Sequence, residues 1–90
     1  NLKQLSELII AYHKKNDFFM NDFSTISFIL HIAVLIERIS MGSYIQRTAL
    51  TEQDKTSLEM AEHLAETLEN ELQINIPTQE LSYIARLYSG

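Results

Sequence analysis

Three histidines are the residues of this chain best suited to chemistry, because an imidazole can carry a proton, a metal ion or a phosphoryl group near neutral pH. They are His13, His31 and His63. His13 is followed by two lysines near the predicted end of a helix, and His63 lies among glutamates. We expect both to be surface residues. His31 differs, because it lies within the most apolar stretch of the chain.

The stretch around His31 is predicted to be a helix from Ser24 to Met41. At about 100° per residue, Ser24, Ser27, His31 and Arg38 fall within one narrow sector of that helix and form its polar stripe. His31 therefore need not point into a dry core. Two interpretations remain open at this point: a structural histidine hydrogen-bonded at the edge of the core, or a functional one.

Enzyme sites have little support in the sequence. The serines near His31 lack a glycine-rich oxyanion loop and an orienting carboxylate, and the chain contains only two glycines, Gly42 and Gly90. A metal site at His63 with Glu59 and Glu66 has too few ligands. We predict that the chain is not an enzyme and binds no cofactor and no metal.

Composition and charge limit the number of domains and the classes of function that the chain can have. The chain has 90 residues, is 46% hydrophobic and carries a formal charge of −5, which indicates one globular domain and disfavours direct contact with nucleic acid. It has no cysteine, as is common in a reducing cytoplasm. Polar residues interrupt the apolar stretch from Ile26 to Ile39, so we expect no membrane span. Because the chain begins at Asn1, we expect a piece of a larger protein.

Helical periodicity accounts for most of the chain. A first helix is predicted from Leu2 to Lys15, followed by a break at Asn16 and Asp17. The helix from Ser24 to Met41 is apolar over most of its circumference, so we expect it to be central and packed on several sides, and Gly42 to end it. The segment from Ser43 to Leu50 is ambiguous, either a connector or a short helix.

Two further helices complete the expected fold. Thr51 and Asp54 resemble a capping box at the start of a long helix that ends near Leu72. Its predicted solvated face carries Glu59, Glu62, Glu66 and Glu69. Its predicted core stripe consists of Leu58, Ala61, Leu64, Ala65, Leu68 and Leu72. Pro77 and Thr78 indicate the start of a last helix, with Leu81, Ile84, Ala85 and Tyr88 on one face. The prediction is a single domain over residues 1–90, an all-α, compact bundle of four to five helices.

Two segments carry a resemblance to a known family. The central helix reads His31-Ile-Ala-Val-Leu-Ile-Glu37-Arg38-Ile39, with Gly42 after it. The closing segment runs from Glu71 through Ile76-Pro77 to Glu80-Leu-Ser-Tyr83-Ile-Ala85. Together they resemble the PTS regulation domain, or PRD, of bacterial transcriptional antiterminators and activators that respond to sugars.

The resemblance implies a five-helix bundle that usually forms a homodimer in the cytoplasm. It implies phosphorylation of a histidine by the phosphocarrier HPr or by an enzyme II component of the sugar phosphotransferase system. The phosphoacceptor position falls on His31, and Arg38 is the nearest candidate in the sequence for a phosphate partner. Two positions depart from the family pattern: Leu30 replaces an acidic residue that often precedes the first histidine, and Leu87 replaces the second histidine.

Alternatives to this regulatory interpretation remain. The chain could be a purely structural dimerisation domain in which His31 is never modified. A metal-dependent helical-bundle enzyme is a third class. On the regulatory interpretation, the nucleic acid is bound by another domain of the regulator, and this domain contacts neither nucleic acid nor membrane.

Overall fold

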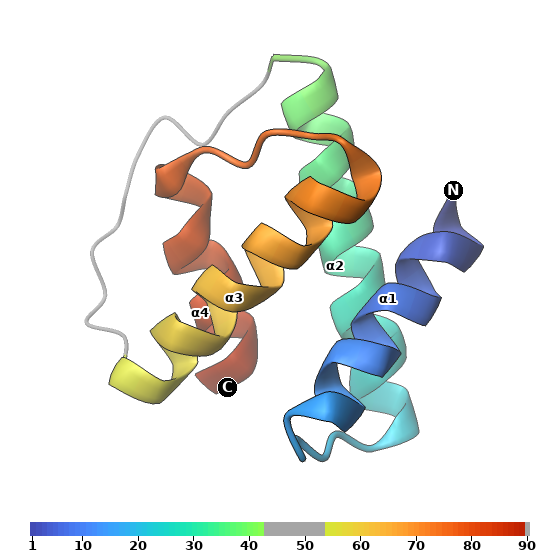
Figure 1. The fold of residues 1–90 in the computed structure, drawn as a ribbon, viewed down its shortest axis with the longest axis vertical. Helices are drawn as coiled ribbons and strands as arrows, with labels where there is room; N and C mark the ends of the chain where they lie inside the picture. Colours follow the sequence, from blue (N-terminus) through green and yellow to red (C-terminus); the bar gives the residue numbers. More distant parts are fainter. Residues whose placement is uncertain (43–53, 90) are drawn as a thin grey trace.

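A computed structural model describes residues 1–42 and 54–89, and within these ranges the chain folds into four α-helices (Figure 1). They are α1 (Leu2–Lys15), α2 (Asp22–Ser40), α3 (Lys55–Leu72) and α4 (Leu81–Ser89), with a short 3-10 helix, η1 (Thr78–Glu80), leading into α4. The predicted all-α bundle is confirmed. The ambiguous segment after Gly42 lies outside the described residues.

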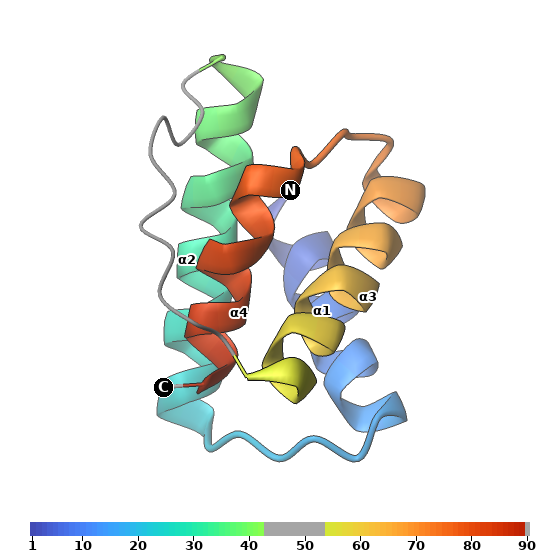
Figure 2. The same ribbon diagram turned by 90° about the vertical axis from the view of Figure 1, so that its left-hand side faces the viewer.

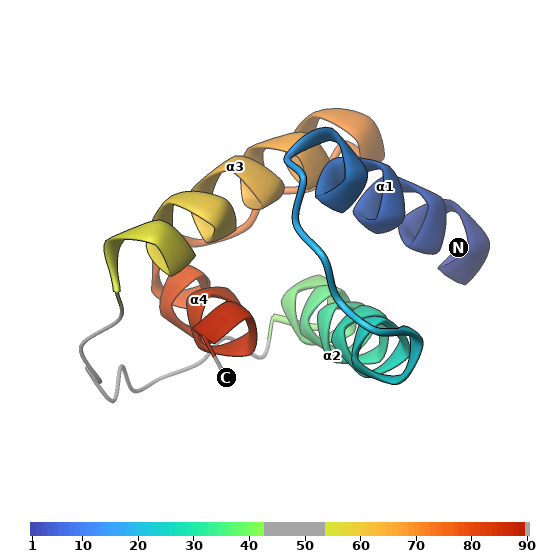
Figure 3. The same cartoon turned by 90° about the horizontal axis from the view of Figure 1, so that it is seen from below.

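The helices form two layers. Figure 3 shows α1 and α3 in one layer and α2 and α4 in the other. Helix α3 packs mainly against α4, and α1 contacts both α2 and α3. Figure 2 shows α4 in front of α2, on the side of the bundle away from α1. The central helix of the family resemblance, α2, and the end of its closing segment, in α4, therefore lie in the same layer.

The first backbone N–H groups of a helix have no acceptor within the helix, and side chains just before the helices accept hydrogen bonds from them. The side-chain oxygen of Asn1 accepts from Lys3 N and Gln4 N, and Asn21 accepts from Ser24 N. Helix α3 begins at Lys55 because Asp54 accepts hydrogen bonds from the backbone and the hydroxyl of Ser57. These bonds also hold the pKa of Asp54 below its usual value. Asp54 is thus the N-cap, and Thr51, the predicted cap, lies outside the described residues.

The helix ends agree with the sequence signals. Gly42 follows α2 with a φ of 75°, a left-handed conformation in which a side chain would be strained. Asp17 has a φ of 52° in the predicted break after α1. The backbone after α3 turns at Gln73, with a φ of 56°.

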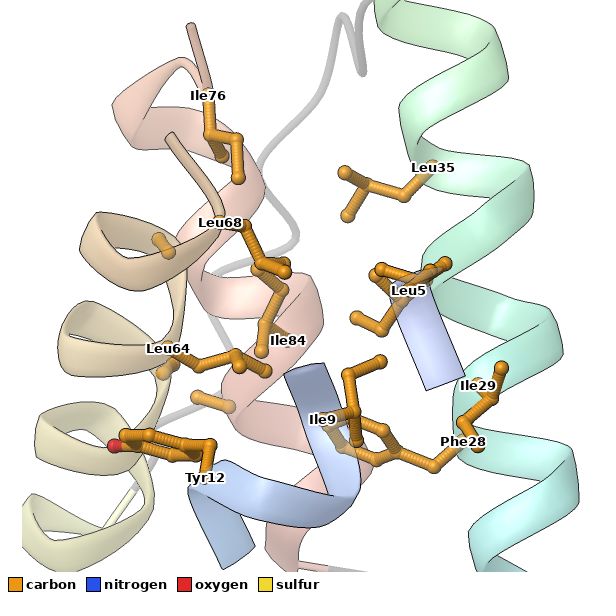
Figure 4. Packing of buried hydrophobic residues seen from close by; sticks show 14 residues of the cluster. Leu5, Ile9, Tyr12, Phe28, Ile29, Leu35, Leu64, Leu68, Ile76 and Ile84 are labelled. Atoms are coloured by element: carbon orange, nitrogen blue, oxygen red, sulfur yellow. The ribbon is translucent and has the colours of Figure 1, made fainter. Parts of the chain in front are cut away.

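All four helices contribute to one hydrophobic core (Figure 4). Its buried members are Leu5, Ile9, Tyr12, Phe28, Ile29, Ile32, Leu35, Ala61, Leu64, Ala65, Leu68, Ile76, Ile84 and Ala85. The predicted stripe of α3 is largely correct but is wrong at its first position. Leu58 is 36% exposed, and Ser57 is buried in its place, with its hydroxyl satisfied by Asp54.

Helix α2 is not packed on several sides, contrary to the expectation from its composition. Its inner face belongs to the core, but Phe23, Ile26, Leu30, Val34 and Met41 are exposed. At 100° per residue these five side chains share one side of the helix, which we call the outer apolar stripe. The exposed Glu37 interrupts this stripe between Val34 and Met41, so its continuous apolar part runs from Phe23 to Val34. Such an apolar surface is typical of an interaction site.

The outer apolar stripe also explains the hydropathy of α2. By length and composition α2 passes the test for a helix that could cross a membrane, which for one helix is weak evidence and does not overturn the sequence-based expectation. The same test is passed by core helices of globular proteins. The inner face of α2 packs into the bundle core through residues such as Ile32 and Leu35, which have no exposed surface.

Matched leucines on α3 test the position of the core. Leu68 is 0% exposed and Leu58 is 36% exposed. Replacing Leu68 with Ala is expected to lower the free energy of unfolding by about 2 to 5 kcal/mol, because it removes buried apolar surface and leaves a cavity. Leu58→Ala is expected to cost less than about 1 kcal/mol. Urea unfolding of both variants provides the comparison, and equal losses would place Leu58 in the core.

Candidate functional site

His31 lies on α2 with its imidazole exposed and held at one ring nitrogen. Its Nδ1 is 2.7 Å from the backbone oxygen of Ser27, one helical turn earlier. A carbonyl oxygen can only accept, so Nδ1 carries the proton in the neutral ring and donates it. The lone pair is then on Nε2. The ring is therefore oriented for reaction at Nε2, with the tautomer inferred from the hydrogen bond.

A groove of about 430 Å³ runs between α2 and α4 beside His31. Helix α2 contributes Ser24, Ser27 and His31 to its lining, and α4 contributes Arg86 and Leu87. Apolar side chains, including Phe28, line the rest. Leu87, the residue at the family's second histidine position, thus lines the same groove as His31.

Leu30 does not take part in this groove. Its side chain is half exposed on the outer apolar stripe. The absence of an acidic residue at this position does not leave His31 without a partner, because the Ser27 carbonyl already holds Nδ1. The ring orientation therefore depends on the helix backbone of α2.

Arg38 is bound to another helix. Its two terminal guanidinium nitrogens each lie 3.4 Å from a different carboxylate oxygen of Glu80. The Arg38 side chain is 28% exposed and that of Glu80 is 0% exposed. The guanidinium also lies 5.4 Å from the ring centroid of Tyr83, which is on α4. The centroid of the Tyr83 ring lies 6.5 Å from that of His31, which like Arg38 is on α2. Arg38 thus joins α2 to the start of α4.

His13 is not a surface residue, which corrects the sequence-based expectation. It is 5% exposed, and its Nε2 lies 2.7 Å from the hydroxyl oxygen of Tyr88. Its ring packs against the rings of Phe18, Phe28 and Tyr88. Burial lowers the pKa of His13 and raises that of Tyr88, so both side chains favour their neutral forms. His13 is a core histidine that fastens α1 to α4.

His63 is exposed on α3, as predicted. In the described ranges, 1–42 and 54–89, no group of three or more histidine, cysteine, aspartate or glutamate side chains is arranged to hold a metal ion. The expected glutamate face is exposed at Glu59, Glu62 and Glu66. Glu69 is half-buried instead, because its carboxylate accepts a hydrogen bond from the backbone of Ile76.

Two residues of the site were not identified from the sequence. Glu80 was assigned only to the closing motif, although a glutamate two residues after a helix-start signal and before an apolar face could have indicated a buried partner. For Arg86 the sequence offers one signal, its place directly before Leu87 at the family's second histidine position. The proximity of Glu80 to Arg38, and of Arg86 to His31, depends on how α4 packs beside α2, which the sequence alone does not give.

The fold and the site define a small all-helical module with an exposed histidine, His31, beside a groove between α2 and α4. A family model of the PRD domain matches residues 6–90, and the chain belongs to this family of PTS regulation domains. A PRD is a regulatory domain under control of the phosphotransferase system and is not a catalytic family. No curated protein and no solved structure matches the chain.

The burial of His13 predicts a specific pH dependence of stability. Because the pKa of His13 is lower in the folded protein, the unfolded chain binds more protons below its usual pKa of about 6.5. The contribution of His13 to the free energy of unfolding is complete above about pH 6.5, and it is lost as the pH falls toward the pKa of His13 in the folded protein. The free energy of unfolding should therefore decrease from pH 7 to pH 5, by at most about 1.4 kcal/mol per pH unit from this group.

Urea unfolding at pH 7, 6 and 5 measures this effect. His13→Gln should reduce the slope between pH 7 and 5, whereas His63→Gln, at an exposed position, should leave it unchanged. An identical slope in the wild type and in His13→Gln would show that His13 is not the titrating group.

Proposed function

We propose that this PRD receives a phosphoryl group on Nε2 of His31 from HPr or from an enzyme II component of the sugar phosphotransferase system. The modification changes contacts between subunits or domains of a bacterial, cytoplasmic, sugar-responsive transcription regulator. The observation that carries the proposal is the exposed His31 ring, whose Nδ1 donates to the Ser27 carbonyl and leaves the Nε2 lone pair available.

The proposed transfer requires little from the domain itself. The Nε2 lone pair forms a bond to the phosphorus of the donor's phosphohistidine or phosphocysteine, while the bond from phosphorus to the donor atom breaks. The electron pair of that bond leaves with the donor side chain. The hydrogen bond from Nδ1 to Ser27 O keeps the ring oriented throughout. No metal or cofactor of this chain takes part in the step.

The position of His31 suggests how the signal is passed on. On α2 the polar stripe lies between the core face and the outer apolar stripe. A phosphoryl group adds about −1.5 to −2 charges at this boundary. An apolar contact surface next to such a charge loses affinity unless a cation compensates it. Phosphorylation at His31 can therefore alter any contact that covers the outer apolar stripe.

We infer that a second copy of the chain covers this stripe in a homodimer. The stripe includes two side chains that are more than two-thirds exposed, Phe23 at 83% and Met41 at 70%. A two-fold dimer would pair the stripe with itself and remove these side chains from water. The net charge of −5 makes this domain unsuited to nucleic acid, so the output belongs to another domain of the regulator.

A purely structural dimerisation domain is the second candidate function. The outer apolar stripe favours it directly, because association through that surface needs no modification of His31. The two candidates differ only in whether His31 accepts a phosphoryl group.

Phosphorylation is tested by incubating the domain with enzyme I, HPr and labelled phosphoenolpyruvate, with and without enzyme II components. Acid-labile label is expected on the wild type and should be lost in His31→Ala, because no other exposed ring is presented in this way. His63→Ala is the matched control, at an exposed position on α3, and should label as the wild type does.

Two outcomes would change the assignment. Labelling of His31→Ala at the wild-type rate would move the phosphoacceptor to another residue. A wild type that takes up no label from any donor would leave the structural dimerisation domain as the better description.

The dimer surface is tested by placing a charge on the outer apolar stripe. Val34 lies near its centre and is more than half exposed, so Val34→Glu should preserve the fold. Buried in a dimer, the new carboxylate should raise the dissociation constant at least about tenfold. Leu58→Glu, at a partly exposed apolar position on α3, is the control and should leave the dissociation constant unchanged. Sedimentation equilibrium gives both values, and a monomeric wild type at high concentration would contradict the homodimer.

A further inference from the structure

The groove beside His31 has an unusual charge for this protein. The chain carries a formal charge of −5, with 12 acidic residues against 7 lysines and arginines. Yet the lining of the groove includes no aspartate or glutamate among the described residues, and its one permanently charged side chain is Arg86. The groove therefore favours an anion in an otherwise acidic domain.

Arg38, the cation suggested by the sequence, is already engaged. It forms its two-point contact with the buried carboxylate of Glu80 and lies over the ring of Tyr83. Moving its guanidinium to a phosphoryl group would take a cation away from a fully buried carboxylate, which is strongly unfavourable. Arg38 thus has a structural role in the unmodified fold.

Arg86 has no such engagement. Its side chain is exposed, and its guanidinium makes no ion pair with any residue in the described part of the chain. It comes from the last turn of α4, where a cation also offsets the helix dipole. The dipole does not explain why its side chain lines the groove opposite His31 rather than pointing away from it.

We propose that Arg86 binds the phosphoryl group on His31 and that this ion pair joins α2 to α4. The inference rests on the proposed function, since it assigns a partner to the same phosphohistidine. A guanidinium presents a planar pair of N–H donors that matches two phosphoryl oxygens. The contact exists only in the folded, phosphorylated protein, because the two residues are far apart in the sequence. Phosphorylation therefore stabilises the pairing of the two helices.

The test uses chemical phosphorylation, so that it does not depend on a protein donor. Potassium phosphoramidate transfers its phosphoryl group to an exposed imidazole. Nε2 forms the new nitrogen–phosphorus bond, the nitrogen–phosphorus bond of the reagent breaks, and ammonia leaves with the electron pair. In a His63→Ala background His31 is the exposed histidine, because His13 is buried. Peptide mass spectrometry at neutral pH confirms the modified residue.

Urea unfolding at pH 8 and at one protein concentration then compares phosphorylated and unmodified forms. With Arg86 present, phosphorylation should raise the ratio of folded to unfolded protein, by roughly threefold to tenfold for a charge-assisted pair at a partly exposed site. Arg86→Gln should abolish or reverse this gain. Arg86→Lys should keep part of it, because it keeps the charge and loses the planar pair of donors.

Lys55→Gln is the control, because it removes an exposed cation from the start of α3 and should keep the full gain. An equal gain in Arg86→Gln and in the wild type would refute the role of Arg86, and so would a loss of stability on phosphorylation that is the same in all variants. Failure of the proposed function is a separate result: it shows as an absence of labelling from HPr and enzyme II, whatever phosphoramidate gives.

Discussion

The fully buried carboxylate of Glu80 is the constraint on which the arrangement of α2 and α4 depends. An ionised carboxylate removed from water costs several kcal/mol unless a cation and hydrogen bonds compensate it. Arg38 contributes to that compensation from the second half of α2, with two nitrogens facing two oxygens. Because Glu80 ends η1 directly before α4, the ion pair fixes where the last helix starts against α2.

A second contact fixes the other end of the same helix. Tyr88, near the end of α4, bonds to His13 of α1 and packs against Phe28 of α2. The two ends of α4 are thus held by polar contacts that are largely shielded from water. Arg86 and Leu87, which line the groove beside His31, lie between these two contacts along the chain. Because α4 is anchored, the residues that line the groove keep fixed positions. A charge added at His31 would then interact with these neighbouring protein groups more strongly than with charges separated from it by bulk water.

The sequence predicted the helices well because caps and periodicity are local properties. Leu2–Lys15 and the ends of the later helices follow from them. The errors concern contacts between distant segments. His13 was expected at the surface because of its neighbours in the chain, whereas its burial depends on Phe28 and Tyr88. The composition of α2 is apolar over most of its circumference, but composition does not distinguish a face buried in the core from an exposed apolar face.

The candidate site shows the same division between local and distant information. The motif around His31 made this residue the candidate, but the nitrogen proposed to accept the phosphoryl group follows only from the Ser27 contact. The structural role of Arg38 follows only from Glu80. Leu87 appeared in the sequence merely as a lost histidine. In the folded domain it lines the groove together with His31 and Arg86.

The replacement of that histidine has a chemical consequence. Two phosphohistidines in one groove would bring together two groups of about −1.5 to −2 charges each, and their repulsion would oppose full modification. With Leu87 at the second position, the groove has one histidine, the proposed acceptor His31, on α2 and one cation, Arg86, on α4. A single phosphorylation can then be partly compensated within the domain, because Arg86 carries one positive charge against about −1.5 to −2 charges on the phosphoryl group. On the proposed function, this arrangement makes the response a single step, in which one added charge strengthens the α2–α4 pairing and alters the contacts of the adjacent outer apolar stripe.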